Sequence, residues 1–246
     1  MPGMTENTSS TPPVAVVTGG SAGLGRAIAT ALAGRGWSVV IDGRRADELT
    51  AAAAAIGTGR VTAVVGDVAD ARHREALVAS AQSLGPVTLL INNASQLGPS
   101  PQPNLRDYPL EVLSDLYAVN VLAPIALSQH LLRDLAESNG AIINVSSDAA
   151  VEPYPGWGGY GGSKAALDQV SAVLGAEETA VAVYAFDPGD MRTEMHQQAF
   201  PGEDISDRPE PETVVPVVLR LIDERPASGR YRASDLTTGA ELEAAL

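Results

Sequence analysis

A regular alternation of short apolar runs with longer segments of helical periodicity constrains this chain most strongly. Each run is separated from the next by enough residues for a crossover helix. Because the runs are apolar on both faces, they predict a parallel sheet covered by helices on both sides. With a last strand expected at 230–233, the pattern predicts one doubly wound α/β domain of about seven strands. The other runs lie at 14–17, 37–41, 61–65, 87–91, 141–145 and 181–186.

Polar residues at the start of the chain mark the expected N-terminal boundary of this domain. Residues 1–12 are rich in Ser, Thr, Pro and Asn without an apolar period, which predicts a disordered tail before a domain over 13–246. The 246 residues are 45% hydrophobic, which is enough for one large core without a second domain. The segment 190–212 contains Met195, Phe200 and several Gly and Pro residues, which predicts a mobile lid.

Charge and composition exclude several classes of function. The chain has 30 acidic and 16 basic residues, a net charge of −14, and no cysteine, so disulfides and thiolate chemistry are excluded. Its acidity argues against nucleic-acid and membrane partners. The three histidines, His73, His130 and His196, are scattered, and no metal site is predicted. No stretch approaches the roughly 18 uninterrupted apolar residues of a membrane span. The beginning of the chain resembles no secretory leader, which predicts a soluble, cytoplasmic protein.

A glycine-rich turn follows the first apolar run and opens directly into a helix. It reads Thr18-Gly19-Gly20-Ser21-Ala22-Gly23-Leu24-Gly25. Glycines allow the backbone to turn sharply and to approach a pyrophosphate, whose charge then lies at the helix N-terminus. An isolated glycine-rich turn is more often structural, but the strand before this one and the helix after it favour a dinucleotide site.

The spacing Gly-x-x-x-Gly-x-Gly, with the preceding Thr18, resembles the short-chain dehydrogenase/reductase family. Other motifs of that family follow in the same order, and the resemblance covers about residues 13–235. It implies a Rossmann-type single domain and an NAD(P)-dependent oxidoreductase (EC 1.1.1.-) that transfers hydride between a nicotinamide and a small-molecule carbonyl or alcohol. The other motifs are Asn92-Asn93-Ala94-Ser95, where Ser95 replaces the family's glycine, then Asn120, Ser147, Tyr160-x-x-x-Lys164, and Pro188-Gly189 with Thr193.

The end of the second strand bears on which nicotinamide cofactor is preferred. Relatives that prefer NAD place Asp there, whereas those that prefer NADP place a small residue followed by Arg. The equivalent positions are Gly43 and Arg44, with Arg45 adjacent. Asp42 is one residue early, and strand alternation predicts that it points to the other face. The pattern therefore predicts NADPH/NADP+ in preference to NAD, since a guanidinium matches a 2′-phosphate. The alternative is that these arginines simply cover the sheet edge.

The resemblance implies the remaining cofactor contacts. Asp67 corresponds to a residue that contacts adenine, although it is also placed to cap the next helix. Thr193 and the backbone of Met191 are expected to bind the nicotinamide carboxamide. The full set of implied cofactor contacts is Thr18, Gly19, Ser21, Gly23, Leu24, Gly25, Arg44, Arg45, Asp67, Val68, Asn93, Ala94, Tyr160, Lys164, Pro188, Gly189, Met191 and Thr193.

Tyr160 and Lys164 are four residues apart and therefore share one face of a helix. A phenol with a pKa of about 10 is a poor acid or base at pH 7, and a nearby ammonium is expected to lower that pKa. Tyr160 then acts as general acid or base. By resemblance, Lys164 also binds the nicotinamide ribose, Ser147 hydrogen-bonds the substrate oxygen, and Asn120 holds a water. Lys164 is the single lysine among 16 basic residues, which agrees with a specific role.

The substrate pocket is expected to contain an aromatic side chain. Trp157 lies three residues before Tyr160 and is predicted to favour a ring or planar substrate, with plain loop packing as the alternative. Residues 107–191 are strongly acidic, which argues against an acidic acyl-carrier partner and for a free small molecule. A short connection around 177–180 leaves the oligomeric state open between homodimer and homotetramer. The predicted pocket residues are Ser95, Ser147, Trp157, Asp190 and Met195.

Three other functions compete with this interpretation. A nucleotide-binding regulator without turnover normally lacks the Tyr or the Lys, and both are present here. A carrier-linked 3-oxoacyl reductase needs a basic docking surface. Extended-type epimerases need a different glycine spacing and a longer C-terminal domain. NADPH oxidation across ketones, quinones and pteridines discriminates among them.

Overall fold

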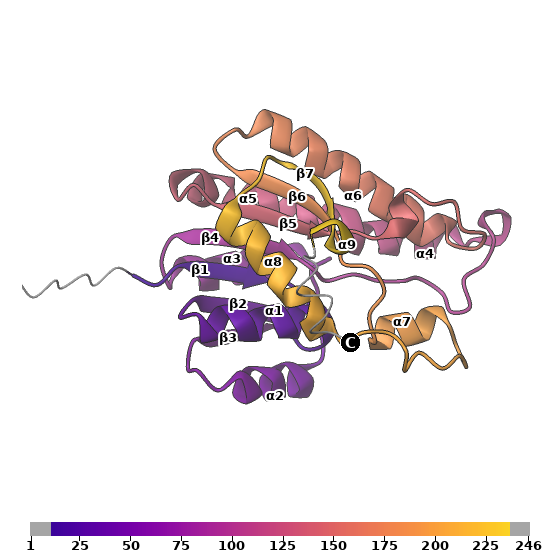
Figure 1. Cartoon of the computed structure of the whole chain (residues 1–246), viewed down its shortest axis with the longest axis horizontal. Coiled ribbons are helices and arrows are strands. Elements are labelled where there is room, and N and C mark those ends of the chain that lie inside the picture. The colour runs from indigo at the N-terminus through magenta and orange to yellow at the C-terminus, as the bar shows by residue number, and fades with distance from the viewer. Residues whose placement is uncertain (1–10, 237–246) are drawn as a thin grey trace, which may run out of the picture.

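The computed structural model describes residues 11–236. Residues 1–10 of the predicted tail, and the last ten residues of the predicted domain, lie outside the described part. Within it, the chain forms a single seven-stranded parallel sheet in the order β3-β2-β1-β4-β5-β6-β7, with helices on both faces (Figure 1). The predicted fold class is confirmed. The strands are β1 Val14–Val17, β2 Ser38–Gly43, β3 Val61–Val65, β4 Val87–Asn92, β5 Ala141–Val145, β6 Ala182–Asp187 and β7 Gly229–Arg232.

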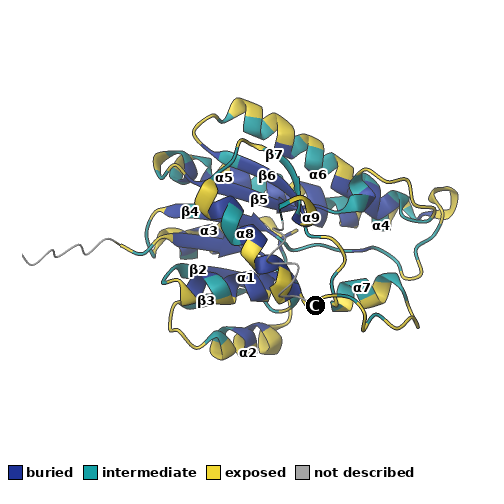
Figure 2. Cartoon of the chain, in the orientation of Figure 1, coloured by how far each residue is buried: buried dark blue, intermediate teal, exposed yellow. Residues whose placement is uncertain are grey.

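Helices cover the two faces of the sheet because successive side chains of each strand point in opposite directions. Val39 and Ile41 of β2 pack in the core under α1 and α8, whereas Val40 packs in the core under α3 and α5. Figure 2 shows the central strands β1, β4 and β5 as deeply buried, whereas the edge strands β3 and β7 are less buried. The helices are α1 Gly23–Gly34, α2 Ala46–Ile56, α3 Ala71–Gln82, α4 Leu110–Tyr117, α5 Ala123–Glu137, α6 Gly158–Glu177, α7 Glu194–Ala199, α8 Val215–Glu224 and α9 Ala233–Leu236.

Three strands extend beyond their apolar runs at the carboxyl end, and one of them is β4, which includes Asn92. β2 includes Asp42 and Gly43, which pair with Val64 and Val65 of β3, and β6 includes Asp187, which pairs with Arg232. Parallel pairing depends on the backbone, so polar residues continue the ladder after the apolar pattern stops. The carboxyl edge of the sheet therefore carries polar side chains on regular strand positions.

Helices α4 and α5 are joined by a π-helical segment, Ala118–Leu122. Together they make Leu110–Glu137, the one stretch among the described residues that is long and apolar enough to cross a membrane. In this fold Leu127, Leu131 and Leu135 of α5 are buried against the sheet. The apolar face of α5 thus belongs to the core, as in helices that cover a parallel sheet.

Candidate active site

A cavity of about 970 Å³ opens at the carboxyl edge of the sheet. Ligands of doubly wound sheets bind at this edge, at the point where the strand order reverses. In this sheet the reversal lies between β1 and β4. The predicted site residues line the cavity with three exceptions, which are Thr18, Gly25 and Asn120. The lining includes Gly19, Ser21, Gly23, Leu24, Arg44, Arg45, Asp67, Val68, Asn93, Ala94, Ser95, Ser147, Trp157, Tyr160, Lys164, Pro188, Gly189, Asp190, Met191, Thr193 and Met195.

The glycine turn has a backbone shape that side chains would obstruct. Gly19 and Gly23 have φ values of 66° and 53°, in the left-handed region that favours glycine. A Cβ on Gly25 would lie 2.4 Å from the Asn93 amide nitrogen and 2.5 Å from the Gly19 carbonyl oxygen. The N-cap residue of α1, Ala22, makes no side-chain capping hydrogen bond. The first amides of α1 thus face the cavity without a side-chain cap, which fits a pyrophosphate.

Thr18 stabilises the turn from outside the cavity lining. The Thr18 hydroxyl oxygen accepts hydrogen bonds from the Asn93 and Ala94 amides, at 2.9 and 3.0 Å. It also donates to the carbonyl of Ile91, so the end of β1 is tied to the end of β4. Thr18 therefore acts on the cavity by holding two strands together.

Asp42 is a structural residue that the sequence patterns did not identify. Its side chain is buried, and Oδ1 accepts a hydrogen bond of 2.7 Å from the Gly19 amide. Oδ2 lies 2.9 Å from Nε2 of His73 on α3, as expected for a side chain on the face opposite Gly43. The histidine that appeared scattered in sequence thus helps to fix the glycine turn. A long-range pair of this kind leaves no periodic signal.

Arg44 and Arg45 lie at the rim of the cavity. The Arg44 side chain is 64% exposed and its Nη1 is 3.9 Å from Asp67. Arg45 pairs with Glu48 at 2.7 Å and with Glu194 of α7 at 3.4 Å. These exposed pairs contribute little to stability and leave two guanidinium groups beside the end of β2.

Asp67 does not cap α3. Its Oδ1 accepts a hydrogen bond from the Ala69 amide, whereas Asp70 is the N-cap residue of α3 and accepts from the Arg72 amide. The capping interpretation of Asp67 is wrong. The carboxylate lies on the cavity wall beside Arg44 instead.

Tyr160 and Lys164 lie together on the buried side of α6. Lys164 is 2% exposed, its Nζ donates a 2.7 Å hydrogen bond to the Val145 carbonyl, and it lies 5.6 Å from the centre of the Tyr160 ring. Burial lowers the pKa of Lys164 to about 8, against the opposing charge of Asp168.

The expected lowering of the Tyr160 pKa is wrong in this structure. Burial raises the pKa of Tyr160 to about 12, although hydrogen bonds with the Ser147 and Ser95 hydroxyls lower it. The helical spacing predicted the Lys164 neighbour but not the depth of burial, and desolvation of the phenolate is the largest cause of the raised pKa. At neutral pH, Tyr160 is therefore a protonated phenol, the form that donates a proton.

The two serines at the end of β5 point to different partners. Ser147 Oγ donates a 2.9 Å hydrogen bond to Asp148 and accepts one of 3.2 Å from the Ala149 amide. The Ser146 hydroxyl donates to Asp168. Because Ser147 is also the serine that interacts with the Tyr160 hydroxyl, the geometry supports the choice of Ser147 over Ser146.

Asn120 is buried in the π-helical segment, with its amide bonded to protein groups. Its Oδ1 accepts from the Gln96 amide at 2.8 Å and from the Ser95 hydroxyl at 3.1 Å. Its Nδ2 donates to the Gln96 carbonyl and to Ser163, both at 2.9 Å. Asn120 thus links the loop after β4 to α6, and its role in a water relay stays a prediction.

Aromatic side chains close one end of the cavity. The Trp157 ring centre lies 5.9 Å from that of Tyr160 and 5.8 Å from that of Phe200. Tyr154 and His196 extend this group, at 6.2 Å from Trp157 and 4.9 Å from Phe200. Phe200 follows α7, so the predicted lid segment supplies part of the wall. Tyr154, His196 and Phe200 line the cavity but were absent from the predicted pocket.

Proteins that place a dinucleotide cavity and a buried acid–base pair at one edge of a parallel sheet are NAD(P)-dependent oxidoreductases, and this chain is of that class. Within the described residues, no group of three or more His, Asp or Glu side chains is arranged to hold a metal ion.

The chain belongs to the short-chain dehydrogenase family, whose model, described as short chain dehydrogenase, matches residues 13–204. It is 34% identical over 184 residues to a serine 3-dehydrogenase of Rhizobium radiobacter, covering 73% of this chain and 72% of that one. It is 31% identical over 201 residues to the sepiapterin reductase of Mus musculus, covering 76% and 77%. The structure of a short chain dehydrogenase from Shigella flexneri 2a, complexed with NADP, matches at a TM-score of 0.84 and 28% identity, covering 90% and 97%.

Proposed function

We propose that this protein is an NADPH-dependent reductase of small-molecule ketones or aldehydes, with Tyr160 as general acid. The observation that carries the proposal is the buried Tyr160 phenol beside the Ser147 hydroxyl, in the same cavity as the glycine turn. A nicotinamide, when bound, supplies the hydride. Ser147 orients the carbonyl oxygen, Tyr160 donates its proton to that oxygen, and Lys164 provides an adjacent charge.

The test of this proposal is NADPH oxidation by the purified protein across ketones, aldehydes, quinones and pteridines. Turnover of at least one carbonyl class supports it. Tight NADPH binding without turnover of any carbonyl would favour the regulatory alternative. The carrier-linked alternative is disfavoured because residues 107–191 contain twelve acidic and two basic residues, and this net negative charge repels an acidic carrier.

A preference for NADPH over NADH is part of the proposal. Arg44 and Arg45 lie where a 2′-phosphate would come, beside Gly43, whose missing side chain leaves room next to Ser21. Solved relatives from Shigella flexneri and Escherichia coli are complexed with NADP and NADPH. Both observations support the sequence-based preference.

Arg44→Ala is expected to raise the Kd for NADPH by about 10- to 100-fold, because a charge-assisted contact with phosphate is lost. The Kd for NADH is expected to change less than about threefold, since NADH lacks that phosphate. Fluorescence titration of both cofactors measures this. Arg60→Ala, an exposed arginine before β3, is the control. Equal weakening of both cofactors would contradict the assignment.

The aromatic group around Trp157 supports a substrate with a ring or planar portion. Trp157 and Phe200 face each other across one end of the cavity, beside the Tyr160 ring. Three of the relatives are named sepiapterin reductase, at 31–35% identity. We further propose that residues 190–212 act as a lid, because α7 and Phe200 form part of the cavity wall.

Trp157→Ala is expected to raise the KM for aromatic ketones by about tenfold, because an aromatic pair contributes about 1 kcal/mol beyond its buried area. The KM for short aliphatic ketones is expected to change less than about twofold. Steady-state kinetics with the two substrate series measure the difference. Trp37→Ala is the control, because Trp37 precedes β2 at the opposite end of the sheet from the cavity. It shows how far the loss of any tryptophan changes the KM. An equal rise for both series would show that Trp157 only packs the loop.

We also propose a cytoplasmic homodimer or homotetramer. Exposed apolar side chains on the helices beside α6 support an assembly through this region, because such residues commonly mark protein contacts. They are Leu110, 75% exposed, Leu122, 59% exposed, and Val173 on α6 itself, 44% exposed.

A further inference from the structure

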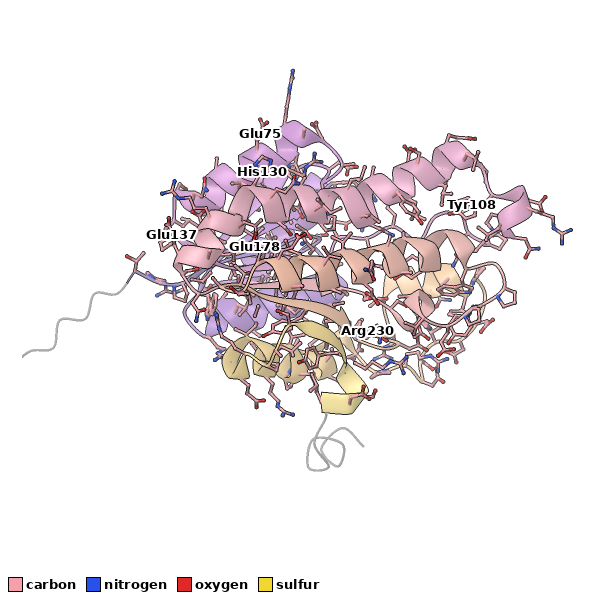
Figure 3. All side chains as sticks on the ribbon, turned by 90° about the horizontal axis from the view of Figure 1, so that it is seen from above. Glu75, Tyr108, His130, Glu137, Glu178 and Arg230 are labelled. Carbon is pink, nitrogen blue, oxygen red and sulfur yellow. The ribbon has the colours of Figure 1, made fainter. Side chains whose placement is uncertain are left out.

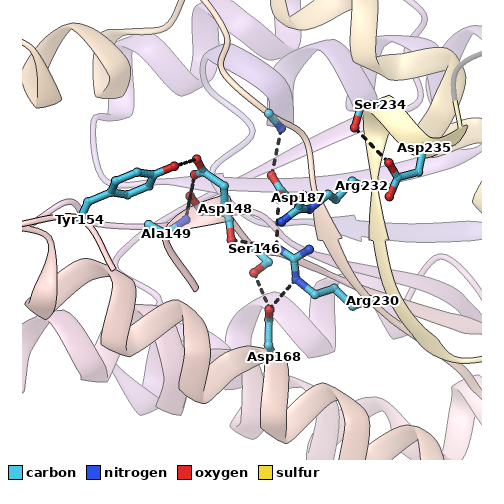
Figure 4. A network of polar contacts seen from close by, with 12 residues as sticks. Ser146, Asp148, Ala149, Tyr154, Asp168, Asp187, Arg230, Arg232, Ser234 and Asp235 are labelled. Carbon is cyan, nitrogen blue, oxygen red and sulfur yellow. Dashed lines mark hydrogen bonds and ion pairs between the residues drawn. The ribbon is translucent and has the colours of Figure 1, made fainter. Parts of the chain in front are cut away.

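A cluster of charged side chains lies directly behind the catalytic edge of the sheet. Arg230, on β7, donates from Nε to Asp168 at 2.9 Å and from Nη2 to Asp187 at 3.0 Å (Figure 4). Figure 3 shows Arg230 on the side of the molecule where β7 runs beside α6. The three side chains are 25%, 15% and 5% exposed, so their charges are largely removed from water. We call Arg230, Asp168 and Asp187 the Arg230 cluster.

The same guanidinium also holds the backbone of the proposed catalytic serine. Nη2 of Arg230 donates a 3.0 Å hydrogen bond to the main-chain carbonyl of Ser147. The preceding residue, Ser146, is bound to Asp168 through its hydroxyl. The Arg230 cluster thus fixes two consecutive residues at the end of β5, where the chain leaves the sheet and turns.

The two carboxylates of the cluster connect it to the rest of the site. Asp168 lies one helical turn after Lys164 on α6, and its charge acts on the Lys164 ammonium. Asp187 accepts a 3.1 Å hydrogen bond from the Gly189 amide, in the turn that lines the cofactor side of the cavity. One arginine therefore joins β5, β6 and α6, which are distant in sequence.

The geometry requires arginine rather than a general cation. Two nitrogens of one rigid planar group reach three acceptors, whereas a lysine ammonium is a compact charge on a flexible stem. Burial lowers the pKa of Arg230, but the hydrogen bonds and charges of Asp168 and Asp187 outweigh it and raise that pKa, so the group stays cationic. Without Arg230, the largely buried Asp168 carboxylate would lose this ion pair, and Asp187 would keep only the longer, 3.7 Å contact with Arg232.

We propose that Arg230 is a positioning residue for the reaction, which holds Ser147 in register with Tyr160 through its main-chain carbonyl. This inference rests on the proposed function of the site. It assigns to a residue of the last strand a part in catalysis that none of the site motifs contains. A displacement of about 1 Å at a reacting group is enough to lower a rate by about 100-fold.

Arg230→Met is expected to lower kcat about 10- to 100-fold and to leave the KM for NADPH within about threefold. Arg230→Lys is expected to restore part of kcat, because lysine keeps the positive charge but lacks the planar set of donors of a guanidinium. Arg232→Met is the matched control, since Arg232 is on the same strand and makes a longer, 3.7 Å contact with Asp187. An unchanged kcat in folded Arg230→Met, with only a lower Tm, would overturn the proposal.

Amide hydrogen exchange gives a readout that does not need turnover. The amides of Ala149 and Ala150 bond to the Ser147 hydroxyl and carbonyl, at 3.2 and 3.1 Å. Their exchange is expected to rise about tenfold in Arg230→Met and to stay unchanged in Arg232→Met. If Arg230→Met does not fold, the exchange of the same two amides is measured in Arg230→Lys. Their exchange is then expected to be faster than in the wild type, by less than about tenfold. Unchanged exchange in the folded variant overturns the proposal, even if the wild type reduces no carbonyl and the proposed function itself fails.

Discussion

Tyr160→Phe is expected to lower kcat for carbonyl reduction by about 10²- to 10⁴-fold, while the Kd for NADPH stays within about threefold of the wild type. The change removes one oxygen from a buried ring and keeps its packing against Trp157. That oxygen is the proton donor in our proposal, and the pKa of Tyr160, raised by burial to about 12, keeps it protonated at neutral pH.

Stopped-flow reduction and cofactor titration separate these two effects. Tyr231→Phe, which removes a phenol hydroxyl bonded to the Ala227 carbonyl away from the cavity, is the control. Full turnover by Tyr160→Phe would remove Tyr160 from the mechanism. A loss of NADPH binding equal to the loss of kcat would assign Tyr160 to cofactor binding instead.

Lys164→Met is expected to lower kcat by about 10²- to 10³-fold, the usual cost of losing one polar group that acts in the transition state. Lys164→Arg keeps the charge but enlarges a side chain that is 2% exposed, and is expected to be similarly impaired. Full activity of Lys164→Arg would show that any cation suffices at this position.

The same substitution has a pH-dependent effect on stability. Burial lowers the pKa of Lys164 from 10.5 to about 8, so below about pH 8 the folded protein carries a buried charge at a cost of about 3 kcal/mol. Between pH 8 and 10.5 the unfolded chain binds more protons than the folded one, and this cost disappears as the pH rises. The difference in unfolding free energy, Lys164→Met minus wild type, is therefore expected to fall by about 3 kcal/mol over that range.

Chemical denaturation at a series of pH values measures this difference. A difference that does not change between pH 7 and pH 10.5 would show that Lys164 titrates normally in the folded protein. A falling difference combined with lost activity would show that the site keeps a residue which reduces stability because the reaction uses it.

Local signals in the sequence were sufficient for the sheet and most of the cavity wall. Apolar runs predicted the strands, because burial on both faces leaves a continuous apolar stretch. The glycine spacing and the Tyr160–Lys164 pair predicted the edge at which the cavity lies, and the family resemblance placed Ser147 and Asn120. These features are carried by neighbouring residues, so their pattern survives in the linear chain.

Contacts between distant segments were not predictable in this way. Asp42 bonds to Gly19 and His73, and Arg230 bonds to Asp168, Asp187 and Ser147. No spacing rule connects such residues, since the separations depend on loop lengths and crossover helices. The same holds for Phe200, which reaches Trp157 only because α7 folds over the cavity.

The sequence by itself determined the fold class, the family resemblance and the identity of the chemical groups at the site. Only the tertiary structure decided the pKa values of these groups and the contacts that hold them in place. The pKa values of Tyr160 and Lys164 move because both groups are buried, and burial is the sum of contributions from many segments of the chain. The helical spacing placed the two side chains together, but burial by the surrounding protein raises the pKa of the Tyr160 phenol and lowers that of the Lys164 ammonium.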